Sequence, residues 1–147
     1  MPPTAALGAI DVINKIYLDS CIAIYLVERH PHFFLPLHLR IAAQVDALFS
    51  VSALTRLEVL ARPLRERDHA LAARYESFLR THEIIAIDDR VVDAALQWRV
   101  AGLKTPDALH VALAQSHGCT GLWTNDDRLA RVLPGWSENV LTGIAHP

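Results

Sequence analysis

The chain has 147 residues, of which 52% are hydrophobic, and its formal net charge at pH 7 is −2. This length suits one domain that buries its own core, and the negative charge excludes nucleic-acid binding through a global basic field. No apolar run reaches the roughly 18 residues of a membrane span, and the first 14 residues lack the basic start of a signal peptide. We therefore expect a cytoplasmic protein with no membrane segment.

Short apolar runs alternate with amphipathic ones from residue 15 onwards, and they are predicted to be strands and helices. In chain order the predicted elements are a strand at 15–19, helices at 21–28 and after Pro36, a strand at 48–51, a helix ending near Pro63, a helix at 65–81, a strand at 83–88, helices at 89–99 and from Pro106, a strand at 121–124, a short helix at 126–133 and a last strand at 138–144. Strands that alternate with helices are typical of a parallel sheet covered on both faces. The predicted fold class is α/β, with four to five parallel strands in a single domain.

Capping residues support several of these boundaries. Ser20 is a candidate N-cap for the first helix, and Ser52 or Thr55 for the helix after the second strand. Thr105 followed by Pro106 is a strong helix start, with Thr105 as the N-cap.

Acidic residues stand where predicted strands give way to helices. Asp19 ends the first strand, Asp126 and Asp127 follow the fourth, and Glu58 and Asp107 lie in the first turns of helices. In a parallel α/β sheet these places converge on one crevice outside the carboxyl ends of the strands. Two unit charges roughly 4 Å apart repel by about 4 kcal/mol at an effective dielectric near 20, so clustered carboxylates need protonation or a cation. Oxygen ligands favour Mg²⁺ or Mn²⁺.

Each of these acids also has a structural explanation. Asp19 and Asp126 can be turn or N-cap residues, and Glu58 can form a capping box with Thr55. Asp107 can be stabilised by the dipole of its own helix. The pattern by itself leaves these roles open beside the metal site.

Other chemistries find less support in the sequence. Cys21 and Cys119 lie in apolar surroundings without a CxxC spacing and are expected to be buried thiols, and the eight His residues show no zinc-binding pattern. A haloacid-dehalogenase-like phosphatase needs a second Asp where Cys21 stands. A receiver domain needs an acidic pair near the first strand and a late Lys, but Lys15 and Lys104 are the only lysines.

The acidic residues belong to four longer motifs, which are YLDS at 17–20, SALTRLEVLARPL at 52–64, TPDALHVALA at 105–114 and TNDDRL at 124–129. In this order they resemble the motifs of the PIN-domain ribonucleases, and most closely those of the VapC-type toxins of prokaryotic toxin–antitoxin pairs. The resemblance runs from about Lys15 to Ile144. It implies a PIN-like domain over 15–147, preceded by an N-terminal extension over 1–14.

The resemblance further implies a metal-dependent ribonuclease whose catalytic and metal-binding carboxylates are Asp19, Glu58, Asp107 and Asp126. It implies Mg²⁺ or Mn²⁺ as the cofactor, an RNA substrate, a cognate VapB-type antitoxin and a homodimer. Thr124 and Asn125 would support the last strand–helix junction, and Asp127 would point to solvent. His110 is expected to pack within its apolar helix.

Two alternatives remain beside this interpretation. A catalytically silent PIN-like module that binds RNA or a partner would have the same fold, and a cleavage assay separates it from the enzyme. Basic residues near the carboxylates in the sequence are candidates for an RNA-binding rim, namely Arg56, Arg62, Lys104 and Arg128. The alternative for these cations is a solvated surface paired with the neighbouring acids.

Overall fold

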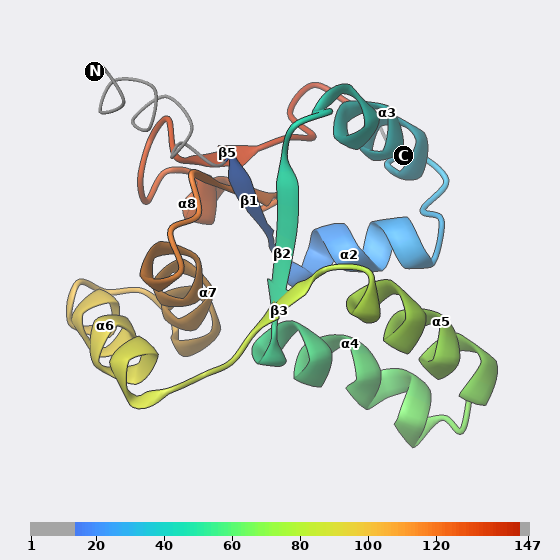
Figure 1. Cartoon of the computed structure of the whole chain (residues 1–147), viewed down its shortest axis with the longest axis horizontal. Coiled ribbons are helices and arrows are strands. Elements are labelled where there is room, and N and C mark those ends of the chain that lie inside the picture. The colour runs from blue at the N-terminus through green and yellow to red at the C-terminus, as the bar shows by residue number, and fades with distance from the viewer. Residues whose placement is uncertain (1–13, 145–147) are drawn as a thin grey trace, which may run out of the picture.

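The computed structural model describes residues 14–144, which form a central parallel sheet with helices on both faces (Figure 1). The predicted N-terminal extension lies outside the described residues, apart from Asn14. The strands are β1 (Lys15–Leu18), β2 (Leu48–Ser52), β3 (Glu83–Ile85), β4 (Gly121–Thr124) and β5 (Ser137–Asn139). Their order in the sheet is β3-β2-β1-β4-β5, and every neighbouring pair is parallel. The predicted α/β fold class is therefore confirmed.

The helices are α2 (Ser20–Val27), α3 (Phe34–Ala43), α4 (Ala53–Arg65), α5 (His69–Arg80), α6 (Asp89–Val100), α7 (Thr105–Ser116) and α8 (Asp127–Ala130). Figure 1 shows α6 and α7 on one side of the sheet and α2, α4 and α5 on the other. Within residues 14–144, none of these helices combines the length and the apolar character that crossing a membrane requires.

Each face of the sheet has its own hydrophobic core. Ile16 and Leu18 on β1 pack with α2, α4 and α5, whereas Tyr17 between them packs with α6 and α7. This follows from the period of two residues along a strand, which sends successive side chains to opposite faces. The consequence for the site is that Tyr17 places a phenol among apolar side chains on the α7 side.

The topology brings the ends of β1 and β4 to the point where the strand order reverses. From β1 the chain moves to β2 and β3 on one side, and it then returns to place β4 and β5 on the other side of β1. In open α/β sheets ligands bind at this switch point, outside the carboxyl ends of the strands. Asp19 follows β1 directly, and Asp126 follows β4 after Asn125.

Several helix starts differ from the predicted ones. Asp19, not Ser20, caps α2, because its carboxylate accepts the backbone N–H of Ser20. The capping box of α4 joins Ser52 with Thr55, so Glu58 has no part in it. Thr105 is the first residue of α7, after Lys104 at the N-cap position.

One predicted helix end is close to the observed one, and one further helix start differs. Pro63 lies inside α4, which ends only at Arg65, because a proline this close to the end interrupts just the last turn. Helix α3 begins at Phe34 and not after Pro36, since a proline is accommodated in the first turn of a helix.

Candidate functional site

The junctions after β1 and β4 are tied together by one threonine hydroxyl. The Thr124 hydroxyl donates to Oδ2 of Asp19 at 2.7 Å and accepts the backbone N–H of Asp126 at 3.0 Å. The backbone N–H of Asp19 donates to the carbonyl of Trp123 at 3.0 Å. Next to it, the Asn125 amide donates to the Tyr25 hydroxyl at 3.1 Å. These bonds hold two of the predicted acids at the switch point of the sheet.

The two adjacent acids after β4 have different surroundings. Oδ1 of Asp126 accepts the backbone N–H of Arg128 at 2.8 Å and so caps α8. Asp127 is exposed, and its Oδ1 accepts the amide of Asn139 at 2.7 Å. Asp126 is therefore held at the junction as a helix cap, while Asp127 faces solvent.

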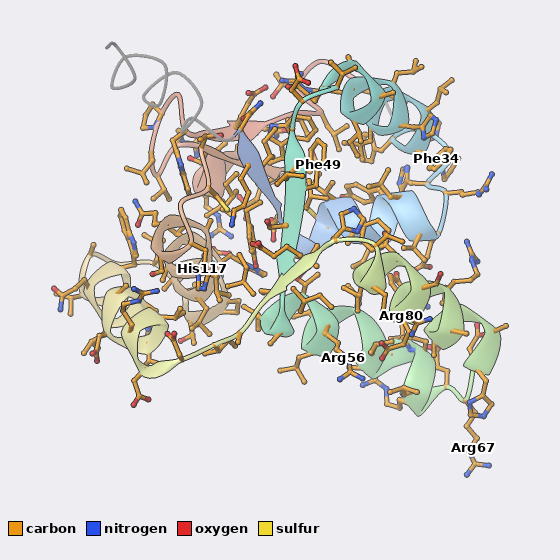
Figure 2. The ribbon with its side chains drawn as sticks, viewed as in Figure 1. Phe34, Phe49, Arg56, Arg67, Arg80 and His117 are labelled. Atoms are coloured by element: carbon orange, nitrogen blue, oxygen red, sulfur yellow. The ribbon has the colours of Figure 1, made fainter. Side chains whose placement is uncertain are left out.

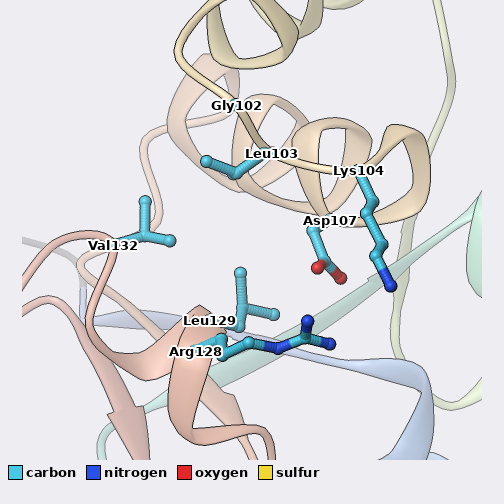
Figure 3. Close-up of a pocket in the computed structure, with 7 residues that line it drawn as sticks. All are labelled: Gly102, Leu103, Lys104, Asp107, Arg128, Leu129 and Val132. Carbon is cyan, nitrogen blue, oxygen red and sulfur yellow. The ribbon is translucent and has the colours of Figure 1, made fainter.

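Asp107 lies in the first turn of α7 and lines a cavity of about 170 Å³. Figure 3 shows its carboxylate between the side chains of Lys104 and Arg128, all three directed towards the same space. Burial raises the pKa of Asp107, and repulsion from Asp126 and Asp19 raises it further. The three aspartates are therefore close enough to interact electrostatically.

Glu58 reaches this region from α4 through two hydrogen bonds to one oxygen. The Ser20 hydroxyl donates to Oε1 at 2.7 Å, and Nε2 of His110 lies 2.7 Å from the same atom. His110 Nε2 is also 3.6 Å from Oδ1 of Asp19. Burial on its own would raise the pKa of Glu58, but the contacts with His110 and Ser20 outweigh it and the pKa is lowered. Glu58 is thus held as a carboxylate.

Two residues of the site were missed or underestimated from the sequence. His110 is buried as predicted, yet it also joins Glu58 to Tyr17, whose hydroxyl is 2.6 Å from Nδ1 of the ring. Tyr17 was not predicted to take part at all. The available signal was its phenol in a buried strand, since a buried hydroxyl needs a polar partner.

The four acids fit a hard cation by their chemistry and by their charge. All supply oxygen ligands, and the mutual repulsion that raises the pKa of Asp107 is what a cation would relieve. The Asp107 carboxylate accepts no hydrogen bond within the described part of the chain. Within residues 14–144, no group of three or more His, Cys, Asp or Glu side chains is close enough together to hold an ion as placed.

Asp107→Asn is expected to raise the free energy of unfolding at pH 7 by no more than about 1 kcal/mol, because the site is partly open to solvent. The folded-state pKa lies above the ordinary 3.8, so the folded protein binds more protons and loses stability as pH rises through this window. The ionised carboxylate at pH 7 carries the whole cost, and the amide removes it. Urea denaturation at pH 7 and towards pH 4 measures this difference, which should shrink at the lower pH. A less stable variant at pH 7 would show that attraction dominates at this position.

Comparison with known proteins identifies the fold. A family model described as the PIN domain matches residues 16–133. No curated protein sequence matches the chain significantly. Among solved structures, a toxin–antitoxin complex from Klebsiella pneumoniae is similar at a TM-score of 0.70 and 23% identity, over 85% of this chain and 97% of that chain.

Two further structures share the arrangement of strands and helices. VapBC2 from Rickettsia felis, bound to a DNA fragment from its promoter, has a TM-score of 0.69 and 18% identity, over 85% of this chain and 98% of that chain. VapC20 from Mycobacterium tuberculosis, a Sarcin-Ricin loop cleaving toxin, has a TM-score of 0.65 and 15% identity, over 78% and 92%. At these identities the likeness is one of fold.

Proposed function

The chain belongs to the PIN-domain family, and on this premise we propose that it is a metal-dependent ribonuclease, a VapC-like toxin that hydrolyses phosphodiester bonds in RNA. The observation that supports the proposal best is that the Thr124 hydroxyl joins Asp19 to the backbone of Asp126 at the switch point of the sheet, while His110 lies between Asp19 and Glu58. Asp107, on a third element, lines a cavity there with Lys104 and Arg128. A purely structural cluster of caps does not require this arrangement.

In this proposal Asp19, Asp107 and Asp126 would hold Mg²⁺ or Mn²⁺, with Glu58 as a further ligand or as the group that orients water. The bound ion would polarise the phosphodiester and lower the pKa of a water molecule. Ser20 and His110 fix one oxygen of Glu58, which leaves Oε2 free to accept a proton or a hydrogen bond.

A covalent nucleophile has no part in the proposed reaction. Cys21 is the nearest thiol, with its Sγ 3.6 Å from Oδ2 of Asp19. Burial, followed by the negative charge of Asp19, raises the pKa of this thiol to about 12. The thiol is therefore protonated at neutral pH and is a poor nucleophile. Hydrolysis by water is the chemistry that remains.

The proposed partner is a cognate VapB-type antitoxin that covers the crevice, as the similarity to toxin–antitoxin complexes suggests. An Arg from such a partner would be well suited to the acidic pocket, because a guanidinium binds carboxylates with two parallel hydrogen bonds. We further propose a homodimer that acts in the cytoplasm, where its RNA substrate is found.

Removal of divalent metal is expected to abolish RNA cleavage by the purified protein, and Mg²⁺ or Mn²⁺ should restore it. The test incubates end-labelled transfer, ribosomal and messenger RNA with the protein, with and without EDTA, and follows the fragments on sequencing gels. Cleavage that persists in EDTA would contradict the metal-dependent mechanism. RNA binding without cleavage in either metal would favour the silent binding module instead.

A further inference from the structure

A chain of buried polar side chains crosses the core behind Glu58. Ser52 Oγ lies 2.8 Å from the Tyr17 hydroxyl, which lies 2.6 Å from Nδ1 of His110, whose Nε2 lies 2.7 Å from Oε1 of Glu58. Ser52 and Tyr17 have no exposed surface, and His110 is 2% exposed. The chain thus joins β2, β1 and α7 to the acid on α4.

The donors and acceptors on these side chains set the directions of the hydrogen bonds between them. An ionised carboxylate only accepts hydrogen bonds, so Nε2 of His110 must carry the proton directed at Glu58. When the ring is neutral, Nδ1 is then an acceptor, and the Tyr17 hydroxyl donates to it. The Tyr17 oxygen in turn accepts from Ser52, whose own oxygen accepts the backbone N–H of Thr55 at 3.3 Å. Each hydroxyl proton is used once, and no buried side-chain polar atom among the described residues lacks a partner.

The two carboxylate oxygens of Glu58 differ in their hydrogen bonds. Oε1 is occupied by Ser20 and His110, whereas Oε2 has no hydrogen-bond partner among residues 14–144. The side chain is 32% exposed, so its outer end remains accessible to solvent. A glutamate that is free to rotate would lose conformational entropy when it adopts this geometry during the reaction. The two donors hold Glu58 in one geometry before substrate binds, so this cost does not arise in the reaction.

We propose that Tyr17 and His110 are positioning residues, which hold Glu58 by one oxygen and leave the other to act in the reaction. A hydrophobic residue at position 110 would fill the same space, but among the described residues it would leave Glu58 with Ser20 as its one donor and the Tyr17 hydroxyl with Ser52 as its one partner. The effect on catalysis rests on the proposed ribonuclease function, whereas the hydrogen-bond chain itself can be tested without it.

The kinetic test compares Tyr17→Phe, His110→Leu and His110→Gln with the parent. Loss of a partner that orients a ligand typically costs about 10–100-fold in activity, so kcat should fall by this amount in Tyr17→Phe and His110→Leu. KM for RNA should stay within about twofold, because neither side chain is placed to touch the substrate. His110→Gln keeps an N–H near Glu58 and should recover most of the lost kcat.

Tyr75→Phe is the matched control. Tyr75 is 1% exposed, and its hydroxyl is likewise hydrogen-bonded, but it donates to the carboxylate of Glu28 on the other face of the sheet. Removing this hydroxyl should leave kcat unchanged. Equal losses in Tyr17→Phe and Tyr75→Phe would overturn the proposal, as would parent-like kcat in both Tyr17→Phe and His110→Leu.

A spectroscopic measurement separates this inference from the proposed function. Long-range ¹H–¹⁵N NMR spectra of the parent should show His110 with its proton on Nε2, and Tyr17→Phe should shift the Nδ1 resonance as its donor is lost. A proton on Nδ1 alone in the parent would overturn the proposed hydrogen bond from His110 to Glu58. If no RNA is cleaved with either metal, the ribonuclease proposal fails, and the NMR result still decides the positioning of Glu58. Should His110→Leu not fold, Tyr17→Phe carries both measurements.

Discussion

Asp19→Asn is expected to lower kcat for RNA cleavage by at least about a thousandfold, equivalent to roughly 4 kcal/mol of transition-state stabilisation. Asp19 stands at the switch point, and its carboxylate carries the negative charge that a divalent ion would bind. Asparagine has the same shape and is an equally good N-cap, so helix α2 should start as before. Single-turnover rates with Mn²⁺ measure the loss, and a denaturation midpoint checks that the fold is kept.

Asp127→Asn provides the matched control for this change. It removes the same charge from an acid that is next to Asp126 in the sequence. The Asp127 side chain, however, is exposed and accepts a hydrogen bond from Asn139. We expect its cleavage rate to equal that of the parent. If Asp19→Asn cleaves RNA as fast as the parent, or if both variants lose activity equally, the assignment of the site is wrong.

Neutralising Lys104 and Arg128 together is expected to weaken RNA binding roughly tenfold at low salt. Both side chains line the cavity with Asp107 and are directed towards it (Figure 3). Two fewer phosphate contacts should also lower the slope of log K against log salt by about 1.4, at about 0.7 for each contact with a single strand. Fluorescence anisotropy with a labelled RNA, in the Asp19→Asn background to prevent cleavage, measures both quantities.

The control removes two positive charges from α4, those of Arg56 and Arg62. Arg56 pairs with Glu76 at 2.7 Å, and Arg62 contacts Glu28 at 2.9 Å. Figure 2 shows Arg56 and Arg67 on the α4–α5 side of the molecule, away from α7. Replacing Arg56 and Arg62 with Gln should leave the salt slope unchanged. A slope that falls equally for both pairs would show that RNA binding depends on overall charge and not on the crevice rim.

The four basic residues predicted for an RNA-binding rim show how far nearness in the sequence can predict nearness in the structure. All four cations lie near a carboxylate in the chain, and nothing in the sequence separates them. In the structure two of them line the cavity, where Arg128 also lies 3.8 Å from Asp126. The other two are paired with Glu76 of α5 and with Glu28, which follows α2. Glu28 and Arg62 are 34 residues apart, so local pattern could not predict that they pair.

Helix limits were predicted less accurately than the elements themselves. Ser20 was expected to cap α2, but its hydroxyl bonds to Glu58, which comes from a helix 38 residues further along the chain. Asp19, the residue before it, takes the capping role. Both residues are acceptable N-caps by preference, and the tertiary partner of Ser20 decides between them.

The α/β fold class could be predicted from the sequence alone, because hydrophobic periodicity is a local property that alternates here between strands and helices. The approach of Asp19 and Asp126 to each other could also be predicted, since both follow parallel strands and the carboxyl ends of such strands lie at one edge of the sheet. Only the tertiary structure decided which donors hold each acid. Tyr17 and His110 are 93 residues apart, and His110 and Glu58 are 52 apart. Such contacts depend on how α4 and α7 pack against the two faces of β1, which no periodicity within a single segment records.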